Sequence, residues 1–196
     1  MRVSKALGAT QTTPTVYGTG YLGGGGYDVR DCGGKLLPEY QAWSGMLGRC
    51  YSEAKLKVDP SYKGCSVHPD WHNFQVFAEW YTNQENYGKG YDLDKDILVQ
   101  GNKVYSSKTC CLVPKEVNSG VKFRTGFGIS ERPNGDFQVR VNVFGKRVSL
   151  GNFKDGELAK KAYLTHKVGY SKMIAEKYKS ELSLEVYLAL TNINIE

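Results

Sequence analysis

The chain of 196 residues carries 26 Lys and Arg against 20 Asp and Glu, a net charge of +6. Its length fits one large domain or two small ones. A composition of 40% hydrophobic and 23% charged residues excludes a wholly disordered chain. No window approaches the roughly 18 to 20 apolar residues of a membrane span, and residues 1–15 lack the apolar stretch of a secretory signal. We therefore expect a cytoplasmic protein whose five cysteines are thiols or metal ligands.

The first part of the chain is rich in glycine and tyrosine, with most of its glycines between Gly18 and Gly34. A phosphate-binding loop would end in Gly-Lys-Ser or Gly-Lys-Thr. Here Gly34-Lys35 is followed by Leu36. We interpret this part as a flexible arm rather than a nucleotide site.

The middle of the chain shows helical periodicity first and strand-like segments later. Apolar residues recur at three- and four-residue spacing from Pro38 onward, which predicts a helix. A second helix is predicted over residues 70–81. Two short strands around a tight turn are predicted within residues 91–105, followed by a short helical or extended segment at 110–113.

The last third begins with a clear strand pattern, because residues 137–143 alternate between apolar and polar side chains. Asn134-Gly135 and Gly145-Lys146 supply hairpin turns on either side of it. We therefore predict an antiparallel meander, a helix capped by Asp155 and a final helix, with strands at 126–130, 136–143 and 146–151 and helices at 155–178 and 184–190.

Positive charge belongs to this last third. Residues 122–179 hold 13 Lys and Arg against 5 Asp and Glu, whereas residues 1–120 hold 13 against 12. If the apolar residues of the strands face the helix, the polar ones form an outer face able to contact base edges and phosphates. A solvated sheet face is the alternative interpretation. The candidate DNA-binding residues are Lys122, Arg124, Arg132, Gln138, Arg140, Asn142, Lys146, Arg147 and Ser149.

Four segments of this region, 126–129, 137–141, 145–153 and 157–163, resemble an APETALA2-type DNA-binding domain. Their Leu-Gly-x-Phe followed by Glu-x-Ala-x-x-Ala-Tyr carries the resemblance, which covers about a quarter of the chain. It implies that three strands enter the major groove of duplex DNA and that one helix braces them from behind.

A second resemblance lies upstream, in the segments 43–51, 62–71, 93–96, 101–106 and 109–110. They are similar to bacteriophage HNH-type homing endonucleases that carry an APETALA2-type tail. The resemblance implies an α+β protein. In it, a small HNH-like ββα core with flanking helices precedes a three-stranded antiparallel sheet packed on one helix.

The HNH resemblance also implies catalytic roles. Asp94 matches the acidic magnesium or manganese ligand, and Asn102 matches the Asn of the Gly-Asn turn. Lys95 stands where the general-base histidine belongs, and Thr109 where the helix supplies His or Asn. A lysine is protonated at neutral pH and cannot take a proton from water unless burial lowers its pKa by several units. Asp96 is the candidate substitute base or second ligand, and the alternative is that all of these are polar turn residues.

Cysteine placement suggests a structural zinc site. Cys65 and His68 have the close spacing of a zinc knuckle, and Cys50 and Cys110 would complete a tetrahedral Cys3His set. The alternative is that these cysteines are buried thiols.

The sequence thus predicts an arm (1–36), an HNH-like central module (37–120), an APETALA2-like domain (121–180) and a C-terminal helix and tail (181–196). The first hypothesis is a phage protein of the host cytoplasm that binds double-stranded DNA and nicks or cleaves it with a metal. The second is a catalytically inactive DNA-binding regulator or host-interference protein. The third is a protein-interaction module whose basic sheet meets an acidic partner.

Overall fold

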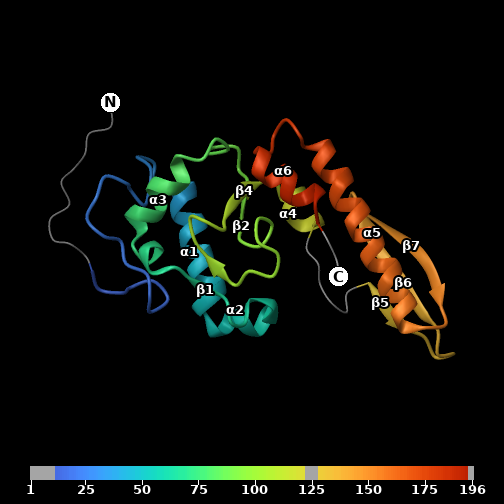
Figure 1. Cartoon of the computed structure of the whole chain (residues 1–196). Helices are drawn as coiled ribbons and strands as arrows, with labels where there is room; N and C mark the ends of the chain where they lie inside the picture. Colours follow the sequence, from blue (N-terminus) through green and yellow to red (C-terminus); the bar gives the residue numbers. More distant parts are fainter. Residues whose placement is uncertain (1–11, 122–127, 194–196) are drawn as a thin grey trace. The chain divides into compact units, whose positions relative to one another are not determined.

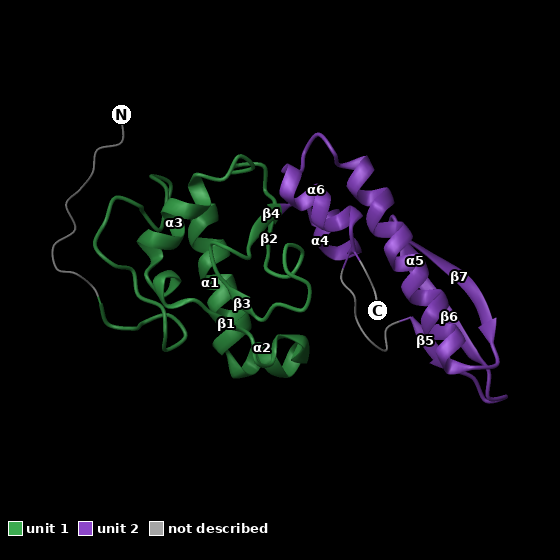
Figure 2. Ribbon diagram, in the orientation of Figure 1, with its two compact units in different colours: residues 1–112 green, residues 113–196 purple. Residues whose placement is uncertain are grey.

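A computed structural model describes residues 12–121 and 128–193 of the chain. It divides the chain into two compact units, residues 1–112 (unit 1) and 113–196 (unit 2), which Figure 2 colours separately. Helices and a three-stranded antiparallel sheet are both present, so the mixed helix-and-sheet class is as predicted. No helix among the described residues combines the length and the apolar character needed to cross a membrane.

Unit 1 is built from short elements (Figure 1). In chain order they are α1 (Pro38–Tyr51), α2 (Glu53–Val58), the 3-10 helix η1 (Pro60–Tyr62), β1 (Ser66–Val67), the 3-10 helix η2 (Pro69–His72), α3 (Phe74–Thr82), β2 (Asp92–Asp94), β3 (Val104–Tyr105) and β4 (Cys111–Val113), which reaches the boundary with unit 2.

Both helical regions predicted in unit 1 are present, whereas α2 was not predicted. α1 begins at Pro38, as predicted, because the first turn needs no N–H from that residue. The predicted helix over residues 70–81 is divided into η2 and α3. The division lies at Asn73, whose side chain accepts a hydrogen bond from the backbone N–H of Gln75 at 3.0 Å and so caps α3.

Aromatic side chains form the core of unit 1. Trp43 and Phe74 are fully buried, with ring centroids 5.4 Å apart, and join α1 to α3. Trp43 also donates its indole N–H to the backbone oxygen of Trp71 at 2.7 Å. Because each aromatic side chain buries roughly 150–250 Å², a few of them supply the core that the short strands cannot.

The short strands of unit 1 correct one prediction. The strands expected around a tight turn, β2 and β3, do not pair with each other: β1 pairs with β3 in parallel, and β2 pairs with β4. The reason is local. The Asp94 carboxylate accepts hydrogen bonds from the backbone N–H groups of Asp96 and Ile97, which ends β2 in a turn.

The glycine-rich segment is attached to unit 1 rather than free. Gln75 of α3 donates from its amide to the carbonyls of Leu22 and Tyr27, and its carbonyl accepts from the Tyr27 N–H. A Cβ on Gly25 would lie 2.3 Å from that carbonyl oxygen, so a larger residue there would have to displace the Gln75 amide. The flexible-arm prediction is therefore wrong for this segment.

Unit 2 contains the predicted meander and helices (Figure 1). In chain order its elements are α4 (Lys115–Gly120), β5 (Ile129–Glu131), β6 (Phe137–Val143), β7 (Lys146–Phe153), α5 (Gly156–Lys177) and α6 (Leu184–Thr191). The strands pair antiparallel in the order β5-β6-β7, as expected. Residues 126 and 127, where the first strand was predicted to begin, lie outside the described residues.

One helix braces this sheet. The Asp155 carboxylate accepts from the N–H groups of Glu157 and Leu158 and caps α5, as predicted. The core between helix and sheet is small, and its buried members are Val139, Val141, Ala159 and Tyr163.

A bulge in β7 modifies the alternation. Val139 pairs with Gly151 but Arg140 pairs with Ser149, so β7 has one residue more than β6 at this point. Gly151 has φ +123°, which favours glycine. As a result Leu150 and Phe153, three residues apart, both pack against the helix-facing core.

Candidate functional site

The outer face of the β5-β6-β7 sheet holds most of the predicted DNA-binding residues. Arg140 lies directly opposite Ser149, and Asn142 opposite Arg147, and directly opposed residues share a face. Val139 and Val141 between them are buried on the helix side. Arg140, Asn142, Arg147 and Ser149 are all exposed, so the side chains point as the alternation predicted.

Gln138 differs from that expectation. It belongs to the same face but is only 9% exposed. Its strand is the central one, and Gln138 lies between Ser130 of β5 and Asn152 of β7. Its burial leaves Gln138 less available to a ligand than the exposed Arg140.

Ser130 and Asn152, which the alternation did not predict, extend the outer face. Both are exposed and lie opposite Gln138. Strict alternation from Arg147 and Ser149 would have placed residue 151, not residue 152, on this face. Gly151 was the available signal, because a glycine inside a strand often marks a bulge.

Of the four residues predicted to contact phosphates, the structure describes two. Lys122 and Arg124 lie outside the described residues. Arg132 is exposed in the β5–β6 turn, where its backbone N–H bonds to the Asp136 carbonyl at 2.8 Å. Lys146 is exposed at the first position of β7. These two therefore border the outer face at its hairpin turns.

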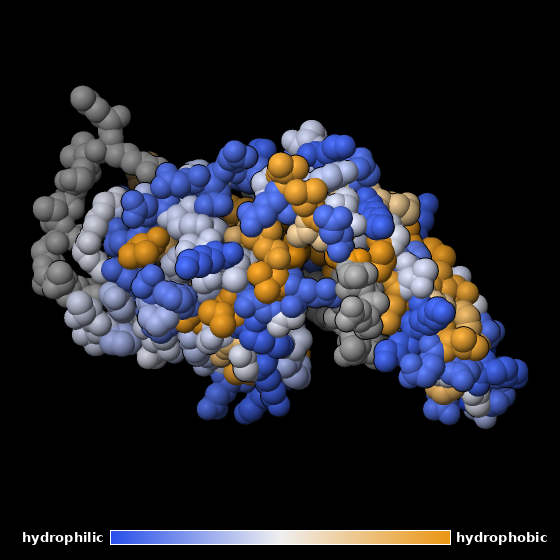
Figure 3. All heavy atoms as spheres, viewed as in Figure 1, coloured by the Kyte–Doolittle hydropathy of each residue, from blue (hydrophilic) through white to orange (hydrophobic). Residues whose placement is uncertain are grey.

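The charge of the outer face is not compensated locally. Among the described residues, Arg140 and Arg147 make no side-chain hydrogen bond or ion pair. The Asp136 carboxylate is bound by Lys154 at 2.8 Å. In the view of Figure 3, hydrophilic and hydrophobic residues both appear over the part of unit 2 where β5, β6 and β7 lie. The face can thus offer free guanidinium, amide and hydroxyl groups to an anionic ligand.

The predicted catalytic residues of unit 1 form a turn whose polar groups are bonded to one another. The Lys95 ammonium donates to the Asp96 carboxylate and to the Asn102 carbonyl, both at 2.9 Å. The Asn102 amide donates to the carbonyls of Lys95 and Val104, both at 2.7 Å. Asp94 and Lys95 are 5% and 6% exposed. The structure brings these four residues together, with Asp94 bonded to the backbone of the same turn.

Burial and neighbouring charge set the protonation of this turn. Burial, with the negative charge of Asp96, raises the pKa of Asp94 to about 6. Burial acts to lower the pKa of Lys95, but its hydrogen bond to Asp96 and the negative charges around it together outweigh this, and the pKa is raised. Lys95 is therefore an ammonium at neutral pH and cannot serve as a general base. Thr109 lies in a turn rather than on a helix and donates to the Val104 carbonyl at 2.9 Å.

The predicted zinc ligands are placed unevenly. Cys50, Cys65 and Cys110 are buried, and burial raises the pKa of the Cys50 and Cys110 thiols to about 12. His68 is half exposed and lies 3.5 Å from Asp70. The described residues contain no group of three or more His, Cys, Asp or Glu side chains arranged to hold a metal ion. The Cys3His site and the magnesium or manganese site stay predictions.

Comparison with protein-family models, with curated proteins and with solved structures finds no match to this chain. The resemblances to APETALA2-type and HNH-type proteins therefore depend on the sequence segments that suggested them.

Proposed function

We propose that the chain is a duplex-DNA-binding protein that contacts DNA through the outer face of the β5-β6-β7 sheet. The observation that carries the proposal is the pairing of Arg140 with Ser149 and of Asn142 with Arg147 on one exposed face. Its charge is free of ion pairs among the described residues.

The chemistry of this face matches the major groove. Arginine can donate two hydrogen bonds to a guanine edge, and asparagine can pair in the same way with adenine. A β-sheet or ribbon can enter a groove of that width. Arg132 and Lys146, at the hairpin turns, are suited to phosphates on either side. The APETALA2-type resemblance of the same segments supports this proposal.

We further propose that the HNH-like module of unit 1 is catalytically inactive, which favours a DNA-binding regulator or host-interference protein over a phage homing endonuclease. The supporting observation is that Lys95, at the general-base position, is a buried ammonium bonded to Asp96 and to Asn102. These polar groups already satisfy one another, so in this proposal they stabilise the turn between β2 and β3.

DNA binding is tested by mobility shift with a random-sequence duplex and then with a selected target, at several salt concentrations. Arg140→Ala and Arg147→Ala should each weaken binding to the selected target about 10-fold. A variant whose arginine also contacts phosphate should in addition lower the slope of log affinity against log salt concentration by about 1. Lys172→Ala removes an equal charge from an exposed position of α5 and is the matched control. Equal affinity of all three variants and the parent would contradict the proposal.

Catalysis is tested separately by incubating supercoiled plasmid with magnesium or manganese. We expect no nicked or linear product. Product formation that disappears in Asp94→Ala would establish the nuclease instead. Elemental analysis of the purified protein tests the structural zinc, where less than about half an equivalent would count against Cys50, Cys65, His68 and Cys110 as ligands.

A further inference from the structure

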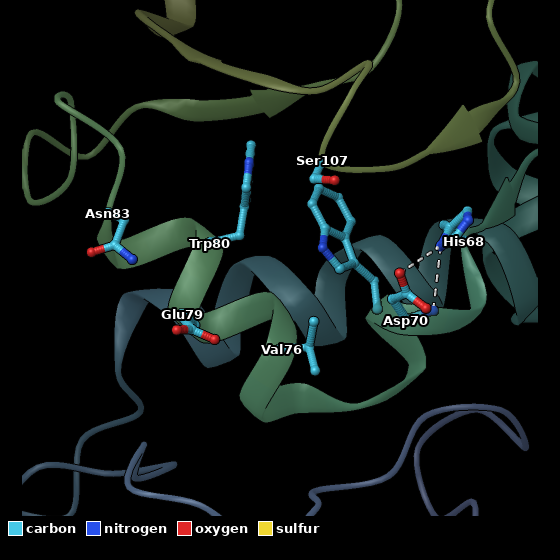
Figure 4. Close-up of a pocket in the computed structure, with 8 residues that line it drawn as sticks. His68, Asp70, Val76, Glu79, Trp80, Asn83 and Ser107 are labelled. Atoms are coloured by element: carbon cyan, nitrogen blue, oxygen red, sulfur yellow. Dashed lines mark hydrogen bonds and ion pairs between the residues drawn. The ribbon is translucent and has the colours of Figure 1, made fainter.

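A depression lies beside α3 in unit 1, far in sequence from the proposed DNA-binding sheet (Figure 4). We name it the Trp80 depression, and its main lining residues are His68, Asp70, Trp71, Glu79, Trp80 and Asn83. Its volume is about 270 Å³. Small-molecule sites commonly enclose roughly 300–1,000 Å³, so this one suits a single group of side-chain size.

The wall of the depression is aromatic and fixed in place. The ring centroids of Trp71 and Trp80 lie 4.7 Å apart, with an angle of 49° between the rings. Trp71 is 2% exposed and packs edge-on against Phe77, with centroids 5.0 Å apart. The exposed part of the Trp80 ring is thus supported by the core of unit 1 and presents a rigid indole surface.

The position of Trp80 on α3 is unusual. α3 buries Phe74, Phe77, Ala78 and Tyr81. Glu79, Trp80 and Asn83 also belong to α3 and line the depression, and in Figure 4 Trp80 extends to the side of the helix where Ser107 lies, whereas Glu79 extends to the opposite side. Trp80 packs against the core through Trp71 and Phe77 but is only partly buried, so part of its ring is left for a ligand.

The charge of the lining is negative. Asp70 and Glu79 both line the depression, and no Lys or Arg does so among the described residues. The Glu79 carboxylate makes no hydrogen bond or ion pair within the described part of the chain. Asp70 lies 3.5 Å from the exposed His68, as the dashed line in Figure 4 marks. Both carboxylates thus keep capacity for an external cation.

From this arrangement we propose that the Trp80 depression binds an organic cation, a guanidinium or an alkylammonium group. Tryptophan is the aromatic side chain that attracts cations best, and a carboxylate forms charge-assisted hydrogen bonds with the same groups. Two carboxylates repel phosphate, so the depression does not extend the DNA-binding surface. The cation is either a free polyamine or an Arg or Lys side chain of a partner protein.

The test uses the full chain and monitors the three tryptophan indole N–H signals by NMR, with the Trp80 signal assigned from Trp80→Phe. Titration with N-acetylargininamide should shift the Trp80 signal in a saturable way. N-acetylcitrullinamide has the same shape without the charge and should produce no saturable shift. Equal binding of the two compounds would overturn the proposal.

Variants separate the cation site from unspecific attraction. Glu79→Gln should weaken binding of N-acetylargininamide at least 5-fold. Glu85→Gln, at an exposed carboxylate that does not line the depression, should leave it unchanged. An unchanged affinity in folded Glu79→Gln contradicts the proposal. Spermidine and the peptide acetyl-Gly-Arg-Gly-amide then distinguish the source: tighter binding of the first indicates a free polyamine, and of the second a protein side chain.

Discussion

Two sets of polar residues in this chain attracted functional predictions, and the structure treats them in opposite ways. In unit 1, Lys95, Asp96 and Asn102 bond to one another, and Lys95 is almost completely buried. In unit 2, Arg140 and Arg147 are exposed and have no ion-pair partner among the described residues.

The difference teaches where binding capacity lies. A buried charge must be paired, because leaving it unpaired costs several kcal/mol. The polar groups of the unit 1 turn therefore bond to one another and stabilise the turn. An exposed guanidinium remains hydrated until a ligand replaces the water. Residues of equal chemical interest in the sequence are thus bonded within the protein in unit 1 and remain available to a ligand in unit 2.

The largest expected effect comes from removing the buried ammonium. Lys95→Met should lower the free energy of unfolding by about 2 to 3 kcal/mol, because Asp96 and the Asn102 carbonyl lose their partner. Arg147→Met, the matched removal of an exposed charge, should change it by less than about 0.5 kcal/mol. Urea unfolding measures both. Similar values for the two variants would abolish the distinction between the two sets.

A smaller effect is expected at the β7 bulge. Gly151→Ala should cost about 1 to 2 kcal/mol, because φ +123° strains any residue with a Cβ. Gly169→Ala, on α5 where no atom lies near the added Cβ, should instead stabilise by about 0.5 to 1 kcal/mol through helix propensity. Thermal unfolding compares the two, and a stabilising Gly151→Ala would argue against the bulge.

The pH dependence sharpens the contrast further. Because the folded-state pKa of Asp94 is raised from 3.8 to about 6, the folded state binds more protons than the unfolded state between these values. The contribution of Asp94 to the free energy of unfolding is therefore present at low pH and is lost as pH rises through the folded-state pKa. Between pH 5 and 6 the loss should be about 1 kcal/mol, and Asp94→Asn should remove it.

Glu116 of unit 2 provides the opposite case. Hydrogen bonds from Lys177 and Tyr178 lower its pKa. Its contribution is therefore lost as pH falls through the folded-state pKa. The difference in urea midpoint between variant and parent should rise with pH for Asp94→Asn and fall with pH for Glu116→Gln. A common direction would refute the pKa shift assigned to one of the two carboxyl groups.

The smallest effect concerns the residues that alternation missed. Ser130→Ala and Asn152→Ala should weaken binding to a selected duplex about 2- to 5-fold, less than loss of Arg140, because neutral hydrogen bonds contribute less than charge-assisted ones. Mobility shift at fixed salt measures this. Unchanged affinity in both variants would mean that Ser130 and Asn152 do not contact the duplex and that only the arginines do.

Much of the local structure could be predicted from the sequence. Pro38, Asp155 and the glycines of the hairpin turns mark element ends through short-range sterics and capping, which depend on few residues. Residues 137–143 have a period of two, so the outward direction of Arg140 and Asn142 followed directly.

Long-range pairing could not be predicted in the same way. Nothing near Val104 or Asp92 indicates that β3 pairs with Ser66–Val67 of β1, or that β2 pairs with β4. Strands of two or three residues carry too little pattern to select a partner. The turn expected to join β2 and β3 has its own side-chain bonds and holds no ladder between them.

The sequence by itself determined the start of α1, the capped start of α5, the meander of unit 2 and the basic character of its outer face, because spacing and turn chemistry act over a few residues. Only the tertiary structure decided that Gln75 holds the glycine-rich segment, that Lys95 is buried against Asp96, and that Trp80 lines an acidic depression. These features depend on which distant groups share a low-dielectric interior or a common surface, and burial and charge there set what each residue can do.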